Sequence, residues 1–430
     1  MKTFYLFFIV TFLSVNLAKA NIIRDSEIEE AINLIIEPLR ANSGLKDLKI
    51  FIIEDAVPNA FTIGDNEIGI TSGLIIDFPD PDVLRGLVAH EIGHILGHHE
   101  ARRDEIVDNY KNATLGTASL GLATAISKVA GPEAEIAGGG MHFAERSIFA
   151  YKSGQEIEAD QTALALLEKS SHSGVGLIKF FEKIDLQLLR DSFNQYDQTH
   201  PVSNQRLLML KSFVKRSKFV LSQNSLDIIN KYKRSAAKLA AFTYEISKIF
   251  DCKFEDDSNE INCYMRAIKC FRIGNFEDSI NHINSLIMKY PNDAYYHELK
   301  AQIYFEAGKS AALNEYEMAE KSRPDDLLIR LGKAVTAITL YKNDIRISRY
   351  YKDLSYVLEK EPENLLALYY MKIYYEKNGL KGKSYLNSAI IAYKSGHIED
   401  AEKNAQMALD ALPKNSAEWK RAGDILEATK

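Results

Sequence analysis

The residues best placed by type and spacing to do chemistry are His90, Glu91 and His94, in the pentapeptide HEIGH. In a helix, residues four positions apart lie one turn apart on the same face. Two imidazoles at this spacing can bind one Zn²⁺ at ~2.0–2.1 Å and leave other coordination positions open. Glu91 would lie within reach of a metal-bound water, take its proton and pass it to a leaving amine. The pentapeptide therefore predicts a metal site with a general base beside it.

A later acidic segment supplies a candidate third ligand. If residues 155–167 form a helix, one stripe along it contains Glu156, Asp160, Ala163 and Leu167. The stripe ends in apolar residues, so it faces inward, and an inward carboxylate needs a partner such as a metal. We expect Glu156 to be the third zinc ligand and Asp160 to hold the free ring nitrogen of a zinc-bound histidine. The alternative is a salt-bridged helix without a metal.

Other polar residues near these motifs have more ordinary interpretations. Glu158 shares its helix face with polar residues, so we expect it in solvent. His98 and His99 follow the pentapeptide and suit the negative end of its helix dipole. A rival zinc pattern, that of the metzincins, requires His or Asp at position 100, where this chain has Glu100. That mismatch, and the lack of a convincing Met-turn, argue against the rival pattern.

A small sheet and two or more helices must position these residues. Residues 26–42 have helical periodicity with isoleucines on one face, and three β-rich runs follow, LKIFIIED, NAFTIG and EIGITSGLI. We expect these runs to form a small antiparallel sheet that leads into the HEIGH helix. Asp80 and Pro81 open that helix as N-cap and first-turn proline. A sheet edge beside a zinc helix suits a protease, because an extended peptide can add to it as another strand.

Composition indicates an exported, multidomain protein. With 430 residues, 26% of them charged, and a net charge of -6, the chain fits two or three globular domains and has no nucleic-acid footprint. Residues 1–20 read as a signal peptide, with Lys2, an apolar stretch and a cleavage site at Ala18-Lys19-Ala20. We expect cleavage, export and no integral membrane segment afterwards. A retained N-terminal anchor is the alternative.

The three cysteines, Cys252, Cys263 and Cys270, lie close together in the sequence. Export permits a disulfide. Cys263 and Cys270 are seven residues apart on one expected helix, roughly 10 Å of rise, which is too far for a bond. The open choices are Cys252–Cys263, Cys252–Cys270, and three buried thiols.

Residues 113–140 are small, apolar and glycine-bearing, and the fifteen residues from Ala113 to Ser127 carry no charge. That run is shorter than the ~20 residues of a membrane-spanning helix. Two interpretations stay open for the segment. It is either a helix packed in the domain core or a mobile plug or membrane-touching loop over the cleft.

The C-terminal half has a degenerate helical repeat. Glycines are followed after 16 or 17 residues by prolines, in the pairs Gly274–Pro291, Gly308–Pro324 and Gly396–Pro413. The first two of these prolines are 33 residues apart, close to the 34-residue tetratricopeptide (TPR) period. We expect the many tyrosines here to serve mainly in repeat packing. Such solenoids offer a concave face for extended or partly folded partners.

A last motif, THPVSNQR, places His200 before Pro201, in an extended conformation, and Arg206 at the start of a helix. With it, the chain resembles the gluzincin family that contains the HtpX-type and CAAX-prenyl proteases. The resemblance covers about residues 55–210. The matching residues are Asn59-Ala60-Phe61, Thr71-Ser72-Gly73-Leu74, His90-Glu91-Ile92-Gly93-His94, Glu156-Ile157-Glu158-Ala159-Asp160, His200-Pro201 and Arg206.

The resemblance implies a set of roles for these residues. It implies zinc on His90, His94 and Glu156, with Glu91 as general base and Arg206 steadying the substrate or the developing oxyanion. Asn59, Ala60 and Phe61 correspond to the substrate strand. Because the chain has an export signal, a C-terminal repeat array and no multi-span region, it is most similar to the periplasmic branch of the family. In that branch the histidine of the His-Pro motif can occupy the open zinc position, so His200 is expected to be a switchable fourth ligand.

The expected architecture is an α+β zincin-like metalloprotease domain, mostly helical with a small antiparallel sheet, followed by an all-α TPR-like solenoid. The expected domains are a signal peptide (1–20), a zinc metallopeptidase (21–215), a helical linker (216–262) and the repeats (263–430). We expect a periplasmic zinc endopeptidase, peripheral to the outer membrane, that cleaves misfolded or misassembled envelope proteins. Its repeats would bind substrates or the outer-membrane assembly machinery. The alternative is a chaperone or scaffold whose zinc site is structural or latent.

Overall fold

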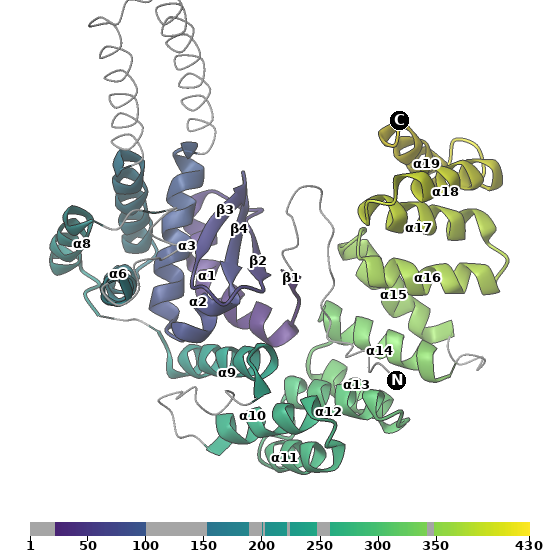
Figure 1. The fold of residues 1–430 in the computed structure, drawn as a ribbon, viewed down its shortest axis with the longest axis horizontal. Helices are drawn as coiled ribbons and strands as arrows, with labels where there is room; N and C mark the ends of the chain where they lie inside the picture. The colour runs from purple at the N-terminus through teal and green to yellow at the C-terminus, as the bar shows by residue number, and fades with distance from the viewer. Residues whose placement is uncertain are drawn as a thin grey trace, which may run out of the picture. The chain divides into compact units, whose positions relative to one another are not determined.

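The computed structural model describes residues 22–99, 153–188, 200, 203–221, 224–246, 259–341 and 348–430 (Figure 1). The signal peptide expected at 1–20, the segment 113–140, Pro201 and Cys252 lie outside these residues. The chain divides into two compact units, which are described separately below. The metal-site unit comprises Ile32–Phe51 and Asp55–Lys233, and the repeat unit comprises Met1–Ala31, Ile52–Glu54 and Arg234–Lys430. The main division therefore falls inside the expected linker, and the first described residues belong to the repeat unit.

The small sheet has four strands in the order β1-β2-β4-β3. These are β1 (Ile22–Ile23), β2 (Lys49–Ile53), β3 (Ala60–Gly64) and β4 (Glu67–Thr71). Strands β1 and β2 are antiparallel, as are β3 and β4. The sheet as a whole is mixed, which corrects the expectation of a purely antiparallel sheet. The difference arises because β2 lies beside β4 and not beside its successor β3, which takes the edge position.

Two short-range signals explain the helices that flank the sheet. Helix α1 (Ser26–Ser43) buries its isoleucine face, as its periodicity predicts. Helix α2 (Ser72–Asp77) replaces the end of the third expected strand. The reason is local, because the Thr71 side chain accepts a hydrogen bond from the Leu74 amide and so caps a helix where the apolar run suggested a strand.

Helix α3 (Pro81–Leu96) is the HEIGH helix and is buried along most of its length. It begins as predicted, with the Asp80 side chain accepting from the Asp82 amide. A helix over residues 153–169 lies beside it (Figure 1). The two come unusually close, since a Cβ built on Gly93 would lie 2.6 Å from the carbonyl oxygen of Ala159. The metal-site unit also contains helices α6 (Val175–Leu188) and α8 (Asn204–Arg216).

The repeat unit is built from consecutive helices that pack on one another. They are α9 (Leu226–Thr243), which crosses the division, α10 (Asn259–Arg272), α11 (Phe276–Lys289), α12 (Ala294–Glu306), α13 (Ala311–Ser322), α14 (Leu327–Leu340), α15 (Tyr350–Lys360), α16 (Leu365–Lys377), α17 (Lys381–Lys394), α18 (Ile398–Ala411) and α19 (Ala417–Ala428). Gly274, Gly308 and Gly396, the glycines of the repeat pattern, all have positive φ in the turns between helices, a conformation that glycine adopts without strain. Seven tyrosines of these helices are buried, most of the others are half-buried, and Tyr369 is 50% exposed.

Two further expectations bear on the chain as a whole. Among the described residues, no helix is both long enough and apolar enough to cross a membrane. Cys263 and Cys270 are free thiols in the structure. The disulfide between Cys252 and Cys263, one of the choices left open by the sequence, is therefore not formed. The Cys263 sulfur instead donates to the carbonyl oxygen of His282, 3.3 Å away.

Candidate metal centre

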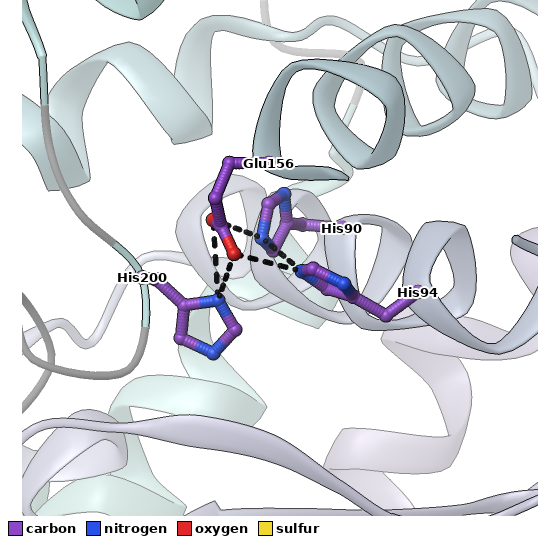
Figure 2. Close-up of side chains that lie close together, drawn as sticks. All are labelled: His90, His94, Glu156 and His200. Atoms are coloured by element: carbon purple, nitrogen blue, oxygen red, sulfur yellow. Dashed lines mark hydrogen bonds and ion pairs between the residues drawn. The ribbon is translucent and has the colours of Figure 1, made fainter. Parts of the chain in front are cut away.

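Four side chains from three segments of the chain converge at one point of the metal-site unit (Figure 2). His90 and His94 come from α3, Glu156 from the helix of residues 153–169, and His200 from a segment just before α8. One ligand atom from each lies within 4.8 Å of the others. The structure thus brings together the three predicted ligands and the predicted fourth one.

The spacing of these atoms fits a tetrahedral metal ion. The Nε2 atoms of His90 and His94 are 3.1 Å apart, and each lies 3.4 Å from an oxygen of Glu156. His200 Nδ1 lies 3.2 Å from Glu156 Oε1. Ligand atoms at ~2.0–2.1 Å from a tetrahedral zinc ion are about 3.3 Å from one another. The donor set of three imidazoles and one carboxylate is also of the kind that zinc prefers.

Asp160 and Arg206 form hydrogen bonds and ion pairs with two of these ligands, His90 and Glu156. Asp160 Oδ1 lies 2.9 Å from Nδ1 of His90, the nitrogen that does not face the other ligands. The Arg206 guanidinium donates to Asp160 through Nε (2.7 Å) and Nη2 (2.9 Å), and its Nη1 lies 2.9 Å from Glu156 Oε2. Asp160 therefore contacts a histidine ligand as expected. Arg206 is buried, with its donors directed at the two carboxylates; whether it also acts on a substrate stays a prediction.

Burial and close charges shift the titration of these groups. For His90, burial lowers the pKa, but the hydrogen bonds to Asp160 and Glu156 outweigh it and raise the pKa to about 10. Burial and the neighbouring His90 lower the pKa of His94 to about 2. Burial raises the pKa of Glu156, but hydrogen bonds to His200 and His90 bring it well below its usual range. The pKa of Asp160 is lowered in the same way, by His90 and Arg206 against the effect of burial.

Glu91 lies on the same helix and faces the ligand set from another side. It is buried, and burial raises the pKa of its carboxyl group. Thr62 Oγ1, on strand β3, donates a hydrogen bond to Glu91 Oε2 (3.1 Å). His200 Nε2 lies 3.6 Å from Glu91 Oε1. His200 therefore occupies the space between the predicted base and the third ligand.

The predicted substrate strand lies at the sheet edge. Ala60 and Phe61 belong to β3, and Asn59 immediately precedes it. Asn59 is buried, and its main chain exchanges hydrogen bonds with Thr71. Because β3 is the edge strand and its Thr62 contacts Glu91, the open edge of the sheet runs past the predicted base.

Sequence reasoning missed two residues of this site. His99, expected only to suit the end of the helix dipole, is buried with Nδ1 2.9 Å from His94 Nδ1, while its Nε2 lies 3.3 Å from Glu158 Oε2. Thr62 was not singled out at all. For Thr62, the signal available in the sequence was a hydroxyl residue in the strand next to the substrate-strand motif.

The fold and the site together define a metallopeptidase domain of the HExxH type. Residues 24–214 match the model of peptidase family M48. The chain is similar to the beta-barrel assembly-enhancing proteases of Yersinia pestis (22% identity over 326 residues) and Escherichia coli O157:H7 (24% over 296 residues). It is also 36% identical over 106 residues to a Protease HtpX homolog of a Sulfurihydrogenibium species.

These similarities differ in extent. The first two alignments cover 74% and 67% of this chain, and 66% and 60% of the relatives. The third covers 23% of this chain and 33% of the relative. The chain therefore spans less than two thirds of the length of these first two relatives.

Proposed function

We propose that this chain is an exported zinc-dependent endopeptidase. The observation that carries the proposal is the convergence of four possible ligand atoms within 4.8 Å of one another. The His90–His94 separation is 3.1 Å, and Glu156 lies 3.2–3.4 Å from each of the three histidines, close to the edge length of a zinc tetrahedron. His90, His94 and Glu156 would hold the ion. Zinc, when bound, would supply Lewis-acid polarisation of the scissile carbonyl and lower the pKa of water.

The chain's own residues would carry the proton transfers. Glu91 would accept a proton from water and deliver it to the leaving amine, with Thr62 fixing one of its carboxylate oxygens. An extended peptide would add to the free edge of β3, where main-chain hydrogen bonds hold it beside Glu91. His200 must move aside first, because it lies between Glu156 and Glu91. We therefore propose that the enzyme is latent until His200 leaves.

The substrate class and the location follow from similarity. Two relatives carry the name beta-barrel assembly-enhancing protease. We propose that this protein cleaves misfolded or misassembled envelope proteins in the periplasm, and that its repeats are TPR-like and bind substrates or assembly partners. Export predicts a mature protein that begins at Asn21 after removal of the signal peptide, which N-terminal sequencing of the exported protein would test.

A second function is favoured by one observation. Four protein ligands around one ion are typical of structural zinc sites, which leave no position for a substrate, and His200 completes such a set. The alternative is therefore a chaperone or scaffold with a structural or permanently latent zinc site.

One experiment separates the two functions. Casein and an unfolded outer-membrane barrel protein are incubated with the wild type, His200→Ala and Glu91→Gln, and bound zinc is measured in each. For an enzyme, we expect His200→Ala to cleave faster than the wild type. Glu91→Gln should retain zinc but lose at least about 100-fold in rate. If all three proteins bind zinc but none cleaves either substrate, the scaffold function is supported.

A further inference from the structure

The repeat unit contains a hollow that is separate from the metal centre. We call it the α12 hollow. Its apolar walls are formed by Ile28 of α1, Phe242 of α9, Phe271 of α10 and Leu328 of α14. Glu298 and Gln302, one helical turn apart on α12, also line it. A carboxyl group in a largely apolar hollow is uncommon and calls for an explanation.

Glu298 is buried, with 5% of its surface exposed. Among the residues that the structure describes, no group forms a hydrogen bond with its Oε2 atom. A buried carboxyl oxygen without a partner has lost its hydrogen bonds to water without replacing them, which destabilises a protein. Because Glu298 lines the hollow, a rotation of its carboxyl group would bring this oxygen to a donor on a bound ligand.

The charges around Glu298 indicate the sign of that donor. Carboxylates approach it from two elements, Asp25 and Glu27 from the start of α1 and Asp326 from the cap of α14. The nearby cation, Lys238 of α9, is already engaged, because its Nζ lies 2.7 Å from Asp25 and 3.3 Å from Glu27. Arg24, which also lines the hollow, is paired with Glu29 and Glu361. The surroundings therefore favour a further positive charge.

A single unpaired oxygen matches a point-like ammonium group better than the two-pronged guanidinium of arginine. Lysine also has a flexible aliphatic stem, which packs well against apolar walls while its charge reaches a carboxylate. The apolar walls and the lone acceptor together match this side chain.

A second hollow on α12 shares two lining residues, Phe271 and Gln302, with the first, and is also lined by Phe305 and Val335. Residues 298, 302 and 305 lie on one face of α12. The distance along the helix from 298 to 305 is roughly 10 Å, enough for about three residues of extended chain.

We propose that the repeat unit binds an extended peptide segment by placing a lysine ammonium group against Glu298, with the apolar residues that flank the lysine lying along α12. The proposal deepens the proposed function, because it rests on the idea that the repeats bind protein substrates or partners. It names a lysine flanked by apolar residues as the recognised feature.

The test is direct binding to the full chain, carrying Glu91→Gln so that no peptide is cleaved. The probe is a fluorescein-labelled peptide with one lysine between leucine and valine residues and serine-glycine ends. A second peptide carries acetyl-lysine instead. We expect the lysine peptide to bind at least about tenfold more tightly than the acetylated one. A further Glu298→Gln substitution should remove this difference, whereas Glu402→Gln, on an exposed glutamate of α18, should preserve it.

A second readout distinguishes a specific ion pair from a general loss of fold. Burial, with the surrounding carboxylates, raises the pKa of Glu298 to about 8. Below that pH an arriving ammonium group must displace a proton, so calorimetry near about pH 7 in buffers of different ionisation enthalpy should detect release of about one proton per peptide. Glu298→Gln should show no release while still unfolding in a cooperative transition.

Equal binding of the two peptides, or unchanged binding by Glu298→Gln, would overturn the proposal. So would no binding by either peptide, even if the wild type cleaves casein, in which case only this inference fails. Conversely, lysine-dependent binding by a zinc-loaded but inactive protein would uphold the inference and reject the peptidase.

Discussion

At the scale of single residues, each histidine of the HEIGH motif has a partner for its second ring nitrogen. Asp160 serves His90. His99 serves His94, because the two Nδ1 atoms are 2.9 Å apart and one of them must donate to the other. If His94 presents Nε2 as the bare ligand atom, its Nδ1 carries the proton and His99 accepts it. His99 would then carry its own proton on Nε2, which faces the Glu158 carboxylate. This series of hydrogen bonds fixes the His94 tautomer that a metal requires.

We therefore predict that His99→Ala weakens zinc affinity by about 10–100-fold. Competition with a colour-changing zinc chelator measures this without relying on peptidase activity. The neighbouring His98 is exposed, with φ +49°, and provides a matched control. His98→Asn, a residue that tolerates this conformation, should leave the affinity unchanged. Equal affinities for the two variants would refute the role given to His99.

How far the site could be predicted depends on the kind of signal each residue leaves in the sequence. His90, Glu91 and His94 follow from helical spacing, and Glu156 and Asp160 from an inward acidic stripe. His99 leaves no such signal, because it lies beyond the end of α3 and is turned back by His98, whose φ is +49°. Its ring also uses the space left by Gly97, where a Cβ would lie 2.3 Å from His99 Nε2. That folding back is a tertiary effect.

At the scale of elements, the metal centre depends on how closely two helices approach. Gly93 of α3 lies against the main chain of Ala159, in the helix that carries Glu156 and Asp160. Any side chain at position 93 would push that helix outward. The glycine of the HEIGH motif therefore sets the distance between the histidine ligands and the carboxylate ligand.

Gly93→Ala is accordingly predicted to destabilise the folded chain by about 1–3 kcal/mol, the usual effect of overpacking, and to reduce zinc binding. Denaturant unfolding and zinc titration measure the two effects. Gly154→Ala, in the facing helix, is the control, because a Cβ there meets nothing within 4 Å. Alanine favours helix over glycine, so this control should be neutral or stabilising. Normal zinc affinity in Gly93→Ala would contradict the argument.

The elements themselves were predicted well where one local signal dominates. Helix α1 follows from its periodicity and α3 from Asp80 and Pro81. The order of the strands could not be read in the same way, because the pairing of β2 with β4 depends on contacts between segments and not on any one of them. The two-residue strand β1 is likewise too short to leave a pattern.

At the scale of the whole molecule, a buried charge cluster joins the beginning of the repeat unit to its helices. Glu27, near the start of α1, pairs with Arg234 and Lys238 of α9 and accepts a hydrogen bond from Tyr264 of α10. Burial raises the pKa of Glu27, but these two cations hold it below its usual range. Glu298, nearby, has the opposite shift, because burial raises its pKa and three neighbouring carboxylates add to this effect, against the lowering by Lys238.

The raised pKa of Glu298 predicts a pH-dependent stability. Its ordinary value is 4.5, against about 8 in the folded chain. Between these values the folded chain keeps a proton that the unfolded chain has released. The free energy of unfolding therefore falls as pH rises through this window, by at most about 1.4 kcal/mol per pH unit. Below the window both forms are protonated and the effect vanishes.

Glu298→Gln should remove this contribution. Denaturant unfolding of both proteins at about pH 5 and about pH 8 would measure it. We expect the variant to lose less stability than the wild type between the two conditions and to be the more stable protein at the higher pH. Identical losses in the two proteins would contradict the assignment.

The order in which the chain is synthesised gives the divided repeat unit a consequence for maturation. Ile23 to Glu30 are made early, yet Arg234, Lys238 and Tyr264, to which Glu27 binds, follow more than two hundred residues later. Every zinc ligand arrives in the interval. A nascent polypeptide could thus load its ion while Glu27 is still hydrated, and the solenoid could close only afterwards, so metal uptake would precede completion of the scaffold.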